Sequence, residues 1–350
     1  MAISFGNRSR QPVKKWLNPD ELKRFFKSEI GAAVVWVFCT LVLAAVLSPW
    51  VYQGGQHLAE MTKTGAPPRV LKWLGEACGR SQFPRFFDRT LMFSALVLLP
   101  PLLRRLRELR AASGVGQENP DRWFTWKSSV AQIAIGCVIA GSLMWGIGMI
   151  VEMLGAFTTS DEPPAWREAL PPILLSAAAA SLVEEWLFRG ILLGMWLRSS
   201  RPRTACLGIS LLFAFLHFLH PPAGRVIEDP GSAHAGFDLL GCILLHFGNP
   251  LFLVTDFATL FGAGLILAWA RVRTGALWFS IGLHAGWILA FKGFQLFYDK
   301  VPGHPLSPWG VGDNLRSGLL PLCALGLTAL ACHFALRRFP AGNVINRASR

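Results

Sequence analysis

The stretch Ser181-Leu-Val-Glu184-Glu185-Trp-Leu-Phe-Arg189-Gly190 puts two carboxylates and a guanidinium inside an apolar run from Pro172 to Leu197. Each ionisable side chain at a bilayer centre costs roughly 2.5–3.5 kcal/mol on insertion scales, so side chains kept there are functional candidates. Glu185 and Arg189 are four residues apart, a spacing at which opposite charges meet on a helix, and we predict an ion pair. Glu184 points about 100° away from Glu185 around the helix axis and needs a partner of its own.

The composition of the chain indicates a membrane protein. Of its 350 residues, 52% are hydrophobic and only 16% are charged, which is typical of a polytopic protein with a lipid-embedded core. The net charge of +13 comes from Lys and Arg residues clustered beside the apolar runs, where the positive-inside bias places them. We therefore expect these charges to face the lipid bilayer and not nucleic acid. The seven cysteines form no CxxC motif and predict no disulfide framework.

The apolar runs predict an all-α fold with about eight transmembrane helices. A helix needs about 20 apolar residues to cross a hydrocarbon core of about 30 Å. The run 237–246 is too short to span and is expected to be re-entrant or interfacial. Eight crossings put both termini on one side, and we assign the cytoplasmic side because the segments placed there hold 22 of the 34 Lys and Arg residues. The predicted spans are residues 30–52, 90–103, 129–150, 172–197, 204–220, 251–270, 274–291 and 319–336.

These spans divide the chain into four parts and predict a multi-pass protein of the cell membrane. Residues 1–29 form a basic, amphipathic cytoplasmic tail. Residues 30–168 hold the first transmembrane helices and their loops, and residues 169–295 form a catalytic core. Residues 296–350 comprise an outer loop, the last transmembrane helix and a basic tail.

Glycines at four-residue spacing occur on two of the predicted spans. Gly190 with Gly194, and Gly282 with Gly286, have the small-xxx-small pattern that lets helix backbones approach closely in a membrane. We therefore predict close helix contacts at both pairs.

Three polar side chains on separate spans are predicted to lie at nearly the same depth. Glu184 and His217 are each 13 residues from the cytoplasmic end of their span, and His284 is 10 residues from the end of its own. A helical rise of about 1.5 Å per residue puts them about 20, 20 and 15 Å into the membrane. A shared buried site requires such agreement, although either histidine taken alone is more often a packing residue.

A glutamate with two histidines suits chemistry that uses water. The carboxylate can accept a proton from water, while an imidazole orients that water or donates to a developing oxyanion. The same three side chains, Glu184, His217 and His284, are ordinary zinc ligands. No HExxH motif accompanies them. We favour a site without a metal or other cofactor and keep zinc held by these three residues as the alternative.

The chain resembles a known family at these residues. Glu184-Glu185-Trp-Leu-Phe-Arg189 is similar to the EExxxR signature of the CPBP intramembrane proteases, which include the type II CAAX prenyl endopeptidases. Phe213-Ala-Phe-Leu-His217 matches their FxxxH signature, and His284 lies where their third motif falls. The resemblance covers roughly residues 170–292. It implies an eight-helix fold and a glutamate-dependent peptidase of a group formerly classed as metalloproteases.

The resemblance implies a role for each matching residue. Glu184 would activate water with the help of His217, and His284 would donate to the oxyanion. Glu185 and Arg189 would orient the site, and Phe213 would pack it. The implied substrates are membrane-anchored peptides or proteins, prenylated C-termini, or sorted surface proteins.

The sequence departs from the family pattern at one position. Residue 288 is Ile where the family has Asn or Asp four residues after the histidine, so the side chain that would assist His284 is absent. Trp287 or a backbone group is expected to substitute for it. Because of this departure, a catalytically silent scaffold of the same fold stays an alternative. A proton-coupled transporter, which also uses buried Glu and His side chains, is a second alternative.

Overall fold

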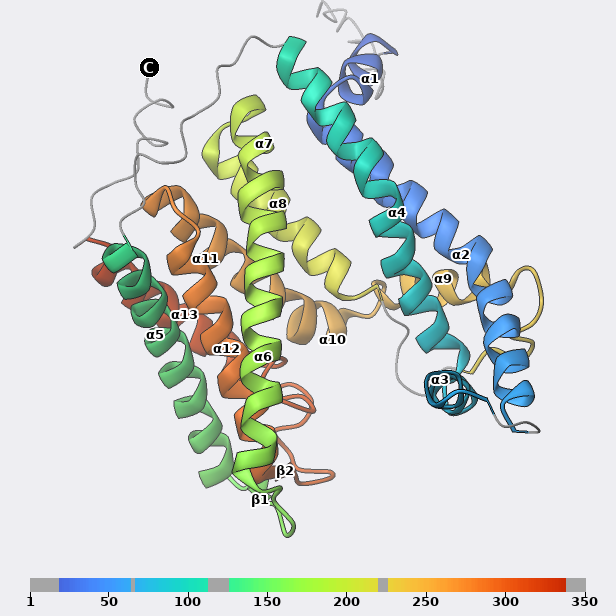
Figure 1. The fold of residues 1–350 in the computed structure, drawn as a ribbon. Coiled ribbons are helices and arrows are strands. Elements are labelled where there is room, and N and C mark those ends of the chain that lie inside the picture. Colours follow the sequence, from blue (N-terminus) through green and yellow to red (C-terminus); the bar gives the residue numbers. More distant parts are fainter. Residues whose placement is uncertain (1–18, 64–66, 113–125, 220–225, 338–350) are drawn as a thin grey trace, which may run out of the picture.

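The computed structural model describes residues 19–63, 67–112, 126–219 and 226–337, and its regular structure is helical apart from one short two-stranded ribbon (Figure 1). The all-α prediction is confirmed. Most of the predicted basic tail at 1–29 and the tail after residue 337 lie outside the described residues. The elements are α1 (Pro19–Phe26), α2 (Glu29–Met61), α3 (Arg69–Gly79), α4 (Phe83–Ala112), α5 (Trp126–Met153), β1 (Phe157–Thr159), α6 (Trp166–Glu185), the π-helix η2 (Trp186–Leu192), α7 (Leu193–Ser199), α8 (Pro202–His217), α9 (Ala235–His246), α10 (Pro250–Phe252), the π-helix η3 (Leu253–Phe257), α11 (Ala258–Thr274), α12 (Trp278–Phe297), β2 (Tyr298–Lys300) and α13 (Leu319–Leu336).

Helices occupy all eight predicted spans, and six of them are long and apolar enough to cross a membrane. The other two are α8 and α12. Helix α8 has only 16 residues, and α12 carries His284, Lys292 and Gln295 among its 20 residues. The six spans are Glu29–Met61, Phe83–Leu109, Ser128–Met153, Trp166–Arg198, Pro250–Thr274 and Leu319–Leu336. The length and apolar composition of these helices therefore identify the chain as an integral membrane protein.

Helices α2 and α4 form a long pair at one side of the molecule (Figure 1). Helix α4 begins at Phe83, so the span predicted at 90–103 is extended outward through Phe83 to Phe87, an extension that the sequence itself suggests. The reason is aromatic packing: Phe83 and Phe86 are buried, and their ring centroids lie 5.6 and 5.2 Å from that of Tyr52 on α2. Such edge-to-face contacts stabilise a helical turn that hydropathy alone does not mark.

Helix α12 is the centre of the second group of helices and packs between α5 and α6 (Figure 1). Gly282 and Gly286 of α12 lie directly against the backbone of α5, where a Cβ atom would collide with the carbonyl oxygens of Ile133 and Cys137. The close contact predicted for this glycine pair is confirmed. The same prediction is wrong for Gly190 and Gly194. A Cβ atom at either position would meet only atoms of its own helix and side-chain atoms at ordinary contact distance.

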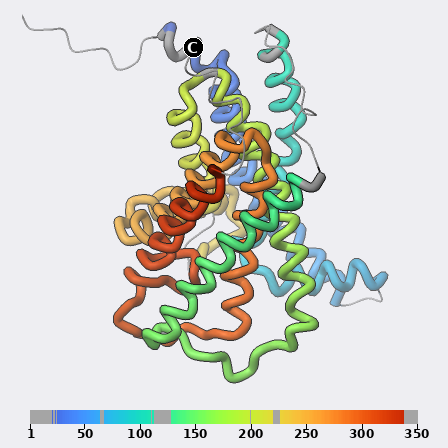
Figure 2. Tube along the Cα trace, turned by 90° about the vertical axis from the view of Figure 1, so that its left-hand side faces the viewer, coloured from blue at the N-terminus to red at the C-terminus, as the bar shows by residue number. Residues whose placement is uncertain are grey.

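The remaining elements close this group of helices. Helix α13 lies alongside α5 and α11 (Figure 2). Strands β1 and β2 pair antiparallel, with Phe157 opposite Lys300, and so tie the segment after α5 to the end of α12. Helix α9, in the run predicted to be re-entrant or interfacial, packs against α2 with Gly236 at the carbonyl of Ala45.

Candidate active site

Glu185 and Arg189 form the buried ion pair that their spacing predicts. The Arg189 Nη1 atom lies 2.8 Å from Glu185 Oε1, and both side chains are fully buried. The guanidinium also donates from Nη2 to the carbonyl oxygen of Gly264 on α11, at 3.3 Å. Arg189 lies within the π-helix η2, which begins directly after Glu185, and π-helical turns are frequent at functional sites. The ion pair therefore joins two helices at the point where α6 changes its helical form.

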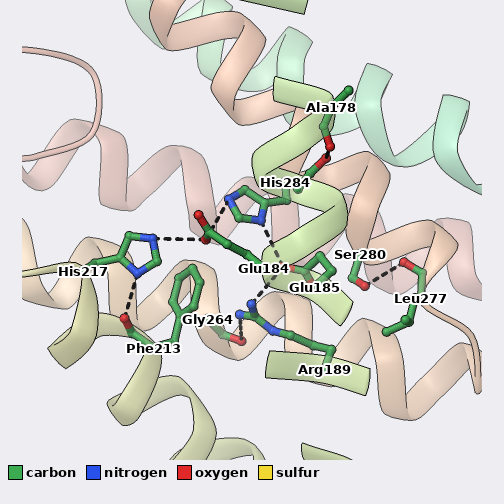
Figure 3. Close-up of polar contacts among 11 residues, drawn as sticks. Ala178, Glu184, Glu185, Arg189, Phe213, His217, Gly264, Leu277, Ser280 and His284 are labelled. Carbon is green, nitrogen blue, oxygen red and sulfur yellow. Dashed lines mark hydrogen bonds and ion pairs between the residues drawn. The ribbon is translucent and has the colours of Figure 1, made fainter. Parts of the chain in front are cut away.

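Glu184 lies between the two predicted histidines (Figure 3). Its Oε2 atom is 3.2 Å from His217 Nε2 and 3.8 Å from His284 Nε2. Glu184 comes from the last turn of α6, His217 from the last residue of α8 and His284 from the middle of α12. The structure thus brings together the three side chains whose equal depth was inferred from three separate spans.

Hydrogen bonding fixes the proton arrangement of His217. Its Nδ1 atom lies 2.8 Å from the carbonyl oxygen of Phe213, and a carbonyl only accepts, so Nδ1 carries a proton. The Nε2 atom then faces a carboxylate oxygen of Glu184 at 3.2 Å. Such a contact is favourable only with one proton between the two atoms, held either by the imidazole or by the carboxyl group. The two atoms are therefore close enough for Glu184 and His217 to share a proton.

His284 is oriented by the buried ion pair. Its Nδ1 atom lies 3.0 Å from Glu185 Oε1, the same oxygen that accepts from Arg189. Because this Glu185 oxygen already accepts a hydrogen bond from Arg189, it acts as an acceptor toward the imidazole as well, which therefore donates from Nδ1 and turns its Nε2 atom toward Glu184. Glu185 and Arg189 thus act on the site by positioning His284.

Phe213 packs against both histidines and the guanidinium, as expected. Its ring centroid lies 4.2 Å from that of His217 and 6.1 Å from that of His284. The Arg189 Cζ atom lies 4.3 Å from the same centroid, within cation–π range. One aromatic side chain therefore holds three polar groups of the site in place.

The position that departs from the family pattern is apolar and enclosed. Ile288 is 8% exposed, and the neighbouring Trp287 is 6% exposed. The indole Nε1 of Trp287 is buried and has no hydrogen-bond partner among the described residues. Buried indole N–H groups usually find a partner. A free donor therefore exists on α12 one turn after His284.

Asp256, the other acid within a predicted span, is engaged away from the histidines. It accepts from Thr255 Oγ1 at 2.7 Å. Its charge also acts on Arg316, in the loop after β2: burial lowers the pKa of that guanidinium, and Asp256 opposes the shift. Within the described ranges, no group of three or more His, Cys, Asp and Glu side chains is arranged to hold a metal ion.

Backbone groups of the site were not foreseen from the sequence. The Gly264 carbonyl that accepts from Arg189 belongs to a helix with no motif of its own. A Cβ atom at Gly264 would lie 3.1 Å from Ser210 of α8, so glycine lets α11 approach α8 beside the ion pair. Glycine at position 264 is the one feature of the sequence that indicates this close approach, and it does not identify the residues that α11 contacts there.

Comparison with known proteins agrees with this geometry. Residues 166–290 match the family model described as type II CAAX prenyl endopeptidase Rce1-like. No curated protein and no solved structure gives a significant match to the chain. The matched range holds α6, α8 and α12, the three helices that carry Glu184, His217 and His284. Residues 166–290 are therefore similar to the Rce1-like type II CAAX prenyl endopeptidases, and the resemblance to the CPBP proteases is confirmed over this part of the chain.

Proposed function

We propose that the protein is an intramembrane endopeptidase in which Glu184 activates the attacking water. The observation that carries the proposal is the distance of 3.2 Å between Glu184 Oε2 and His217 Nε2, at which the two groups can share one proton. In the resting state Glu184 and His217 together hold one proton between their facing atoms and can accept a second. As water attacks the peptide carbonyl, its proton passes to the pair, and the same proton is later given to the leaving amine. The products are a carboxylic acid and an amine, and the pair returns to its resting state.

His284 is the proposed donor to the oxyanion. Because its Nδ1 proton is directed at Glu185, its Nε2 atom can donate only when the ring is protonated. A donor aimed at the charge that develops in the transition state is among the largest contributions to catalysis. The free N–H of Trp287 is a candidate for the second donor, in place of the missing amide at residue 288.

The proposed reaction uses no metal ion. A zinc ion would need Glu184, His217 and His284 to converge to about 2.0–2.2 Å around one point, and would supply a Lewis acid there. Glu184 Oε2 lies 3.2 Å from His217 Nε2 and 3.8 Å from His284 Nε2, and the proposal assigns the activation of water to Glu184 and His217 directly.

The proposed substrate is a membrane-anchored or prenylated peptide. An apolar cavity of about 300 Å³ lies between α2, α7 and α8. Its walls include Phe38, Trp196 and Phe215. A cavity lined almost wholly by hydrocarbon suits the isoprenoid or acyl chain of a substrate.

The proposal is tested by Glu184→Gln, measured as cleavage of a labelled peptide that carries an S-farnesyl cysteine followed by three apolar residues. A general base contributes about 10²–10⁴-fold, and we expect a loss of that size. The matched control is Glu168→Gln, which changes an exposed glutamate near the start of the same helix and should retain activity. Equal cleavage by Glu184→Gln and the unchanged protein would contradict the assignment. If neither the unchanged protein nor Glu184→Gln cleaves the peptide, the catalytically silent scaffold is favoured.

A further inference from the structure

A second apolar cavity, of about 270 Å³, lies between α2 and α4. Its walls include Phe26 at the end of α1, Val35 and Cys39 of α2, and Leu98 and Pro101 of α4. Phe26, Val35 and Cys39 are exposed, so the cavity is a groove on the outside of the α2–α4 pair. We call it the α2–α4 groove. In a membrane, lipid covers an apolar surface of this kind.

The α2–α4 groove and the apolar cavity assigned to the substrate lie on different faces of α2. Val34 and Phe38 line the substrate cavity, whereas Val35 and Cys39 line the groove. Consecutive residues of a helix point about 100° apart around its axis. The groove is therefore a separate site, and the proposed reaction does not use it.

Both helices give the groove a length of about 10 Å. Leu98 and Arg105, which both line it, are seven residues apart on α4, and Ala32 and Cys39 are seven residues apart on α2. The helical rise is about 1.5 Å per residue. An apolar groove of this length that runs along two membrane-spanning helices suits one acyl chain of a phospholipid.

Arg105 is the one charged side chain among the described residues that line the groove. Its Nη1 atom lies 3.6 Å from Glu108 Oε2, but Glu108 Oε1 also lies 3.3 Å from Arg104 Nε. One carboxylate thus serves two guanidinium groups, and the exposed Arg107 adds a further positive charge. The side chain of Arg105 is 49% exposed. Its stem can therefore line the groove while its guanidinium reaches the headgroup layer.

The basic end of the groove lies at the same end of the molecule as α1 and α7 (Figure 1). The positive-inside bias assigns this end to the cytoplasmic side, because Arg198, Arg201 and Arg203 surround the turn after α7. The cytoplasmic leaflet carries anionic lipids, and basic pockets between transmembrane helices on that side bind their headgroups. The charge and the position of Arg105 therefore both favour an anionic lipid.

We propose that the α2–α4 groove binds an anionic phospholipid, with one acyl chain along the groove and the phosphate group on Arg105. A guanidinium can donate two parallel hydrogen bonds to phosphate oxygens. A zwitterionic lipid would fill the groove with the same chain, but its cationic headgroup would lie beside Arg104 and Arg105. The groove therefore selects for the charge of the headgroup as well as for the chain.

The test measures the binding of single lipids to the full-length protein in a neutral detergent, by native mass spectrometry. Phosphatidylglycerol and phosphatidylcholine with identical acyl chains are compared. A hydrogen bond to a charged group corresponds to about 10-fold in binding or more, so we expect the first phosphatidylglycerol to bind about 10-fold more tightly. Arg105→Gln should abolish this preference, and Arg105→Lys should keep part of it. The matched control is Arg107→Gln, at an exposed position of α4 that does not line the groove, which should keep the preference.

A second pair of variants tests the place of the acyl chain. Cys39→Trp puts an indole into the groove and should weaken the binding of both lipids, whereas Cys39→Ala should not. Inorganic phosphate at the same concentration as the lipid should not displace phosphatidylglycerol, because it lacks the chain. Displacement by phosphate, or equal lipid binding by the two Cys39 variants, would overturn the placement of a lipid in the groove.

The headgroup result has its own contrary outcomes. Equal affinity of the unchanged protein for the two lipids overturns the proposal. So does a preference that Arg107→Gln reduces as much as Arg105→Gln, since general surface charge gives that result. If Arg105→Gln does not fold, as judged by thermal unfolding in detergent, the comparison of Cys39→Trp with Cys39→Ala still decides. Peptide cleavage is not part of the measurement, so these outcomes are independent of the proposed function.

Discussion

At the scale of single residues, the site consists of Glu184 between two histidines and of a buried ion pair that orients one of them. The Glu185–Arg189 pair follows from a four-residue spacing, and Glu184, His217 and His284 follow from their depth in three spans. The hydrogen bonds that define the roles of these residues could not be predicted from the sequence. The contact of His217 with the carbonyl of Phe213 depends on how α8 ends. That of His284 with Glu185 depends on the register of α12 against α6.

Trp287 gives the residue-scale prediction. Trp287→Phe keeps an aromatic ring but removes the free N–H. Loss of one oxyanion donor costs about 10²–10³-fold in kcat, and we expect kcat to fall toward that range with KM little changed. Trp36→Phe is the control, since Trp36 on α2 also has a buried Nε1 without a partner among the described residues. Steady-state peptide cleavage measures both variants. Unchanged kcat in Trp287→Phe would assign the second donor to a backbone group.

At the scale of helices, a helix lies at each of the eight predicted spans, but only six are long and apolar enough to cross a membrane and several predicted ends are misplaced. Hydropathy is averaged over a window of residues and carries no information on which neighbouring helix a side chain contacts. The start of α4 is extended by the contacts of Phe83 and Phe86 with Tyr52. The end of α12 is extended past Lys292, which finds Ser176 on α6. Glycine spacing correctly predicted a close helix contact at Gly282 and Gly286. It wrongly predicted one at Gly190 and Gly194.

The contact of α12 with α5 gives the prediction at this scale. In Gly286→Ala the new methyl group meets the backbone carbonyl of Cys137, which cannot move aside as a side chain would. Overpacking of this kind costs about 1–3 kcal/mol, so thermal unfolding in detergent should shift to lower temperature, and the displacement of His284 should lower activity. Gly326→Ala on α13 is the control, because a Cβ atom there meets nothing within 4 Å. A Gly286→Ala protein as stable as this control would contradict the close packing.

At the scale of the whole molecule, the family domain covers residues 166–290 and leaves the α2–α4 pair outside it. That pair contributes one wall of the apolar cavity through α2. The basic residues Arg198, Arg201 and Arg203 surround the turn between α7 and α8. The acidic residues Asp161 and Glu162 lie in the segment between β1 and α6, at the other end of the same helical run.

This charge distribution predicts the orientation in the membrane. By the positive-inside bias the turn between α7 and α8 is cytoplasmic and the segment after β1 is outside. In a variant without its native cysteines, Asp161→Cys should react with an impermeant maleimide added to intact cells. Ser200→Cys should react only after the membrane is opened. The reverse labelling pattern would invert the topology, including the cytoplasmic placement of both termini.

The central claim is that Glu184 itself, and not a metal ion, activates the water. The most direct test is elemental analysis of purified protein that is actively cleaving peptide, with and without a strong chelator. The account predicts zinc far below one ion per chain and cleavage that the chelator does not change. Stoichiometric zinc, whose removal abolishes cleavage and whose return restores it, would contradict the account and make Glu184, His217 and His284 its ligands.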